Sequence, residues 1–216
     1  MPQQQSGENA GTLLPNSIDT FNSAYDPNLG PALAAVEQML GLGQPPSALT
    51  NILAQTIPDY LAGGTVTLTA GTVVSCPIWL QAGVKYSKLS VITAATAAST
   101  PTNQWAGLAT NVTAPIVLAI SADGTTTAIA ADTVITYTLG TAYTPTTTGY
   151  FQFFICVAAT TGPTVAALTL GASHGRANVT PYVSGSGGTG KTTPPAVGAA
   201  LTAVTVGTGV PLVYAT

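Results

Sequence analysis

The segment Gly185–Thr192, with the sequence GSGGTGKT, has the residue types and spacing of a phosphate-binding loop. In such a loop a helix begins at the lysine, and its backbone N–H groups bind the phosphates. Here Lys191 is soon followed by Pro194 and Pro195, and consecutive prolines favour an extended chain. No acidic residue follows Lys191 to help hold Mg²⁺. We therefore interpret the segment as a flexible Gly/Ser/Thr-rich hairpin or surface loop and not as a nucleotide site.

A catalytic triad could combine Ser173 and the single histidine, His174, with either Asp123 or Asp132. No nucleophile-elbow pattern surrounds Ser173, however, so we interpret GASHGRANV as an exposed polar loop. Asp123 and Asp132 flank one apparent hairpin, and Asp123-Gly124 is a turn signal. Turn formation explains these two carboxylates better than paired acid–base catalysis does. We predict that the chain has no catalytic residues, binds no cofactor and is not an enzyme.

Cys76, Cys156 and His174 would together make a minimal soft-metal set. They lack the close spacing that metal-binding motifs show, so we predict no metal site. Each cysteine lies in an apolar, strand-like run, VVSCPIWL or FFICVAA. We expect two buried free thiols that pack as small hydrophobic groups, and a single disulfide between them is the open alternative.

The chain carries few charges. Only 5% of its 216 residues are charged and its net charge is −3, whereas roughly 25% of a typical globular protein is charged. Thr, Ala and Gly take their place, giving a neutral, hydroxyl-rich surface that suits packing in an assembly. The four basic residues form no run, which argues against nucleic-acid binding. The sequence also shows no signal-peptide pattern and no apolar run long enough to span a membrane.

The first 62 residues differ from the remainder. Residues 1–30 are polar and turn-rich, which predicts an extended arm. Apolar spacing predicts two short helices, over residues 30–43 and 46–61. Because two short helices bury little surface alone, we expect residues 1–62 to anchor the chain to another body. The apolar faces of these helices contain Leu33, Val36 and Leu40, and Leu49, Ile52 and Leu53.

From residue 63 onward, the sequence shows many short strand patterns separated by turn residues and no helical period. This predicts a second domain over residues 63–216, a β-sandwich with a jelly-roll-like arrangement. The longest apolar run, GYFQFFICVAATTG, is expected to be the central strand. The predicted fold class is thus mainly β, with an N-terminal arm and two short helices.

Trp79 and Trp105 are the two tryptophans. Aromatic rings of this kind pack in cores or interfaces, or stack on sugar rings. We favour packing, and we keep sugar stacking as the alternative.

The run NQWAGLATNVTAPIVLAISADGTTTAIAADTVITYTLGTAYTPTTTGYFQFFICVAATTGPTVAAL resembles a module that recurs in tailed bacteriophages of actinobacteria. The ending GTGKTTPPAVGAALTAVT…VPLVYAT resembles the end of the same module, where the position of Lys191 is commonly apolar. The resemblance covers roughly residues 65–216. It implies a minor tail protein or another virion structural protein. We therefore expect a minor tail or capsid-decoration component, in which residues 1–62, which the resemblance does not cover, anchor the chain to other virion proteins.

The resemblance further implies a homo-oligomer, most simply a trimer, that is assembled in the host cytoplasm and located in the virion. The alternative is an adhesin on the virion that binds host cell-wall glycan through Trp or Tyr side chains.

Overall fold

The computed structural model describes most of the chain after residue 51, and within these residues the protein is mainly β, as predicted. The strands form three antiparallel sheets, and the described residues contain no α-helix. The described ranges are residues 52–69, 71–112, 114–169, 185–186, 190–201, 205–206 and 209–216.

A six-stranded sheet forms one layer, in the order β11-β10-β3-β8-β5-β6. Strand β8 pairs with β3 on one side, over residues 149–156, and with β5 on the other, over residues 151–158. The longest apolar run is therefore a central strand, as the sequence predicts. The bounds are β3 Val73–Leu80, β5 Asn103–Thr110, β6 Val117–Ile120, β8 Gly149–Ala158, β10 Gly185–Ser186 and β11 Thr205–Val206.

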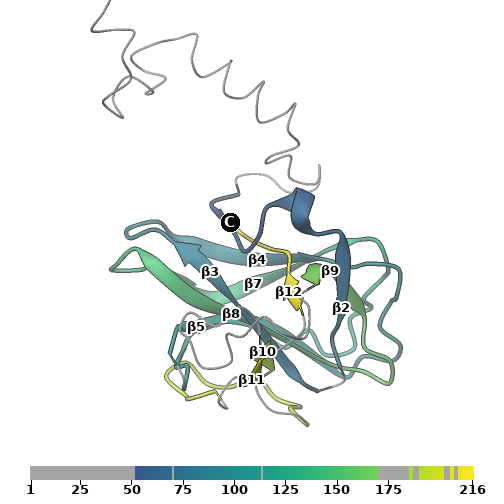
Figure 1. The fold of residues 1–216 in the computed structure, drawn as a ribbon. Helices are drawn as coiled ribbons and strands as arrows, with labels where there is room; N and C mark the ends of the chain where they lie inside the picture. The colour runs from purple at the N-terminus through teal and green to yellow at the C-terminus, as the bar shows by residue number, and fades with distance from the viewer. Residues whose placement is uncertain are drawn as a thin grey trace, which may run out of the picture. The chain divides into compact units, whose positions relative to one another are not determined.

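A four-stranded sheet, in the order β1-β13-β4-β7, forms the facing layer, and a three-stranded sheet, β12-β9-β2, completes the fold. Figure 1 shows β3, β8 and β5 side by side, with β4 and β7 in the other layer. The bounds are β1 Ala54–Gln55, β4 Tyr86–Ile92, β7 Val134–Tyr143 and β13 Val213–Ala215, then β2 Gly64–Thr67, β9 Thr164–Thr169 and β12 Gly209–Pro211.

The main core lies between the six-stranded and four-stranded sheets. Alternate residues of β8, such as Phe153, pack there with Leu89 of β4 and Tyr137 of β7. Two facing antiparallel layers around one apolar core are consistent with a β-sandwich. The opposite, outer face of the six-stranded sheet carries a second apolar cluster, which includes Trp105 of β5 and Phe154 of β8.

The helix predicted over residues 46–61 is wrong in its described part, residues 52–61. The Leu53 N–H donates to the Ala215 carbonyl at 2.9 Å, and the Thr56 N–H donates to the Val213 carbonyl at 3.1 Å. Because of these bonds, residues 54 and 55 form a strand, β1, that pairs with β13, and they do not form a helical turn. Pro58 then precedes a short 3₁₀-helix, Asp59–Leu61, and proline cannot donate a helical hydrogen bond. A distant strand thus overrides the local helical pattern.

The two residues of this predicted helical face that the structure describes do not share one surface. Ile52 is partly buried against the main core, whereas Leu53 is 46% exposed. The other helix-face residues, Leu33, Val36, Leu40 and Leu49, lie outside the described residues, as do the predicted arm and the first helix. The domain boundary between residues 62 and 63 stays a prediction, although β1 already pairs within the four-stranded sheet.

The turn between β8 and β9 requires a glycine at position 162. A Cβ atom on Gly162 would overlap the carbonyl oxygen of Leu68, whereas one on Gly149 would have no atom within 4 Å. We expect Gly162→Ala to lower the free energy of unfolding by about 1–3 kcal/mol, because the backbone must shift to admit the methyl group. Gly149→Ala, the matched control, should change it by less than about 0.5 kcal/mol. Chemical denaturation measures both, and equal effects would contradict the packing described for this turn.

Candidate functional site

The segment with the phosphate-loop pattern lacks the helix that such a loop needs. Gly185 and Ser186 form β10, which pairs with β3 and β11. Residues 191–201 are extended or in turns and contain no helix. The Lys191 N–H donates to the Gly71 carbonyl at 2.9 Å, so it already has a partner. The segment is thus a covering strand and loop on the six-stranded sheet, as the two prolines suggested.

Asp123 is held by three hydrogen bonds at the end of β6. The Asn103 amide donates to its Oδ2 at 2.7 Å, and the backbone N–H groups of Gln104 and Thr125 donate to its Oδ1 at 2.9 and 2.8 Å. Partial burial raises the pKa of Asp123, but these hydrogen bonds together outweigh burial and leave the pKa below its ordinary value. Asp123 therefore fastens the turn to β5, and its three bonds account for its position.

The hairpin expected between Asp123 and Asp132 is wrong, because β6 and β7 lie in different sheets. The hydrogen bonds that Asp123 accepts from Asn103 and Gln104 direct the chain back toward β5, and an isolated bridge joins Ser121 to Leu139 of β7. Asp132 occupies a turn with φ +49°, a conformation that Asp tolerates better than most residues. The other triad candidates, Ser173 and His174, lie outside the described residues.

Cys76 and Cys156 are both buried and free, as predicted. Cys76 packs in the main core and Cys156 in the cluster on the outer face, so the six-stranded sheet separates the two side chains. Burial raises the pKa of Cys76 well above its ordinary value. For Cys156, burial and then the Asp123 charge raise the pKa to about 12, although Lys191 opposes them. Both side chains are therefore protonated thiols at neutral pH, and thiols are poor nucleophiles.

The two tryptophans have different environments. Trp105 is only 1% exposed and packs edge-on against Phe154, with ring centroids 5.9 Å apart. As it lies, its ring offers no face for sugar stacking. Trp79, by contrast, is 47% exposed on the outer face of β3. The packing interpretation therefore describes Trp105, and the stacking alternative applies to Trp79.

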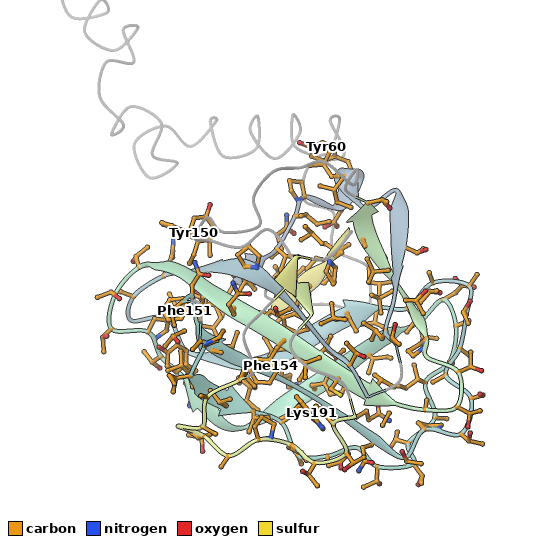
Figure 2. The ribbon with its side chains drawn as sticks, turned by 60° about the horizontal axis from the view of Figure 1, so that its bottom comes forward. Tyr60, Tyr150, Phe151, Phe154 and Lys191 are labelled. Carbon is orange, nitrogen blue, oxygen red and sulfur yellow. The ribbon has the colours of Figure 1, made fainter. Side chains whose placement is uncertain are left out.

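Trp79 forms an exposed aromatic pair with Tyr150, which the sequence analysis missed. The two residues are cross-strand partners on β3 and β8. Their rings meet edge to face at 4.8 Å and 77°, and Tyr150 is 49% exposed. Figure 2 shows Tyr150 and Lys191 on different parts of the unit. The alternation of GYFQFFICVA, with Phe151 and Phe153 facing the core, was the signal that could have placed Tyr150 outward.

Three other possible indications of function are a metal cluster, a membrane-spanning helix and similarity to known proteins. The described residues contain no group of three or more His, Cys, Asp or Glu side chains placed to hold a metal ion. They also contain no helix of the length and apolar character that a membrane crossing requires. Comparison with protein-family models and with curated proteins gave no match. The exposed pair of Trp79 and Tyr150 is therefore a candidate binding surface on the described part of the chain.

The hydrogen bonds of Asp123 should make stability depend on pH. Because its folded-state pKa lies below the unfolded value near 3.8, the ionised carboxylate stabilises the fold above that pH, and the effect is lost as pH falls through the folded-state pKa. Asp123→Asn places an amide group opposite the Asn103 donor and should cost about 1 kcal/mol at neutral pH.

Urea unfolding at several pH values tests this expectation. Asp123→Asn should remove part of the acid-induced loss of stability that the unaltered chain shows. Asp132→Asn is the control, because Asn adopts the same positive-φ conformation readily. An identical pH profile for Asp123→Asn and the unaltered chain would refute the role of this carboxylate.

Proposed function

We propose that the protein is a bacteriophage virion structural protein, a minor tail or capsid-decoration component whose β unit is a jelly-roll-like sandwich. The sequence resemblance to a module of tailed bacteriophages motivates this function. The chain alternates between the two larger sheets, since β4 and β7 belong to one and β3, β5, β6 and β8 to the other, which supports the jelly-roll-like arrangement.

The observation that carries the proposal is the neutral surface of the β unit. Exposed threonines line the outward side of β7, at Thr136 and Thr138, and the loop at residues 146–148. A surface with so little charge provides weak repulsion between copies, which suits a subunit packed in a particle. The described part of the chain contains six charged residues: Asp59, Lys85, Lys88, Asp123, Asp132 and Lys191.

Exposed apolar side chains near the start of the β unit support an anchoring role for the preceding segment. Leu53, Tyr60 and Leu61 are 46%, 56% and 39% exposed, and Tyr60 stands at one extremity of the unit in Figure 2. Burial of such groups against a neighbouring virion protein would be favourable, at roughly 25 cal/mol for each Å² of apolar surface. We propose that residues 1–62 attach the protein to the particle and that the chain is a homo-oligomer, most simply a trimer.

Antibodies raised against residues 65–216 test this proposal on virions of the phage that encodes the chain. We expect gold label at discrete positions on purified particles, because a structural subunit is retained through purification. Label on the tail would identify a tail component, and label on the head a capsid decoration. Antibody absorbed with the full chain is the control. Absence of the protein from intact and disrupted virions, in both labelling and immunoblots, would overturn the proposal.

A second candidate function, recognition of host cell-wall glycan, is favoured by the exposed pair of Trp79 and Tyr150. Half-exposed aromatic rings provide an apolar surface for the C–H face of a sugar, and the Tyr150 hydroxyl can hydrogen-bond with sugar hydroxyls. Such binding would be compatible with a position on the virion.

Binding of the full chain to host envelopes tests this second function. We expect saturable binding that Trp79→Ala weakens at least about tenfold, since a stacking residue near the centre of a site contributes on the order of 1.4 kcal/mol or more. Val112→Ala is the matched control, because Val112 and Trp79 are each 47% exposed. Circular dichroism should show that both variants are folded. Equal binding by the two variants would exclude this aromatic pair as the glycan site.

A further inference from the structure

A small cavity lies on the outer face of the six-stranded sheet, beneath the segment that follows β10. Its volume is about 210 Å³, and its lining includes Val73 of β3, Trp105 of β5 and Leu201. Lys191, Pro194 and Pro195 also line the cavity. Pockets for drug-sized ligands measure roughly 300–1,000 Å³, so this cavity suits a smaller group.

Trp105 supplies a buried hydrogen-bond donor that has no acceptor. Its side chain is 1% exposed and lines the cavity. Among the described residues, no atom accepts a hydrogen bond from its indole Nε1–H. A buried donor without a partner is uncommon, because it has lost its hydrogen bond to water and gained none in return. A ligand oxygen in the cavity would provide the missing acceptor.

Lys191 places a positive charge at the same cavity. It is exposed, and it is the one charged residue among those described in the cavity lining. Its backbone is fixed on both sides, since its N–H donates to the Gly71 carbonyl at 2.9 Å and its carbonyl accepts from the Cys156 thiol at 3.8 Å. These contacts hold the root of the side chain in place at the cavity, so the ammonium group can reach a ligand bound there.

The apolar walls of the cavity are also held in place. Pro194 and Pro195 restrict their own backbone angles. Farther along the segment, the Val117 N–H donates to the Ala199 carbonyl at 2.9 Å, and the Leu201 N–H donates to the Pro115 carbonyl at 2.7 Å. The cavity is therefore largely formed before any ligand enters, which reduces the entropy lost on binding.

We propose that this cavity binds a carboxylate group carried on a short aliphatic stem. One carboxylate oxygen accepts from the Trp105 indole, and the charge is balanced by the Lys191 ammonium group. The stem packs against Val73, Leu201 and the proline rings. The carboxylate belongs either to a small free acid or to an acidic side chain of a peptide, and both have the same recognition chemistry.

Phosphate fits this cavity less well than carboxylate, even though Lys191 belongs to a phosphate-loop pattern. Phosphate sites use several converging backbone N–H groups, often at the start of a helix. Pro194 and Pro195 have no N–H to donate, and the Lys191 N–H is already bonded to Gly71. Inorganic phosphate is therefore the ligand that distinguishes a carboxylate site from a phosphate site in the experiment.

The test uses the full chain with Trp79→Phe, which leaves Trp105 as the only tryptophan. The single indole N–H resonance is followed by NMR while butyrate is added in a buffer without carboxylates. We expect a saturable shift with a dissociation constant on the order of 1 mM, given the few contacts available. Butanol and inorganic phosphate should produce no saturable shift. Absence of a shift with butyrate, or an equal shift with butanol or phosphate, overturns the proposal.

Two variants in the same background locate the site. Lys191→Gln removes the positive charge but keeps a polar, only slightly shorter side chain, and it should weaken butyrate binding about tenfold, as expected for loss of the balancing charge. Lys85→Gln alters an exposed lysine that is not part of the cavity lining and should have no effect. Equal binding by these two variants excludes Lys191 from the site and overturns the proposal.

Trp105→Phe removes the indole donor and should weaken binding at least about tenfold when measured by calorimetry. If this variant does not fold, the Lys191→Gln comparison still decides the question. The N-acetylated amide of glutamic acid separates the two sources of the carboxylate. Tighter binding than butyrate supports an acidic peptide side chain, and weaker binding supports a free acid.

Discussion

From Gln152 to Ala158, strand β8 is buried on both of its faces, and each face supports a different part of the molecule. Phe153 faces the main core between the two larger sheets, whereas Phe154 and Cys156 face the cluster beneath residues 190–201. Because β8 pairs with all of β3 on one side and all of β5 on the other, it also fixes the positions of their outward side chains. The exposed aromatic pair and the Trp105 cavity therefore share one framework.

Much of the β architecture is predictable from local sequence. The run NQWAGLAT coincides with β5, and the longest apolar run becomes the central strand. The environments of Trp79 and Trp105 are not predictable in this way. Both lie on the outer face of strands whose inner face is apolar, and among the described residues the later segment 190–201 lies over Trp105. Period-two alternation identifies a face, but it does not report what covers that face.

The two errors of the sequence analysis have a common physical cause. Residues 46–61 have helical spacing, yet residues 53–56 bond to the strand at Val213–Ala215. Asp123-Gly124 is a turn signal, yet the Asp123 carboxylate bonds back to Asn103 and Gln104. In each case, partners distant in sequence decide the structure, and a local pattern contains no information about them. The phosphate-loop pattern does not form a phosphate-binding loop for a related reason, since its lysine is part of an extended segment that covers the six-stranded sheet.

The bonds around Thr56 have a consequence for the kinetics of folding. Its hydroxyl donates to the carbonyl of Pro211, which lies 155 positions later in the sequence. The same hydroxyl accepts from the N–H of Val213, which lies 157 positions later. Closing a loop of that length loses considerable chain entropy before any contact compensates for it. Sheets dominated by such contacts fold on a timescale of roughly milliseconds to seconds. The four-stranded sheet can be completed only after nearly the whole β unit has been synthesised, and until then β4 presents an unpaired edge to its surroundings.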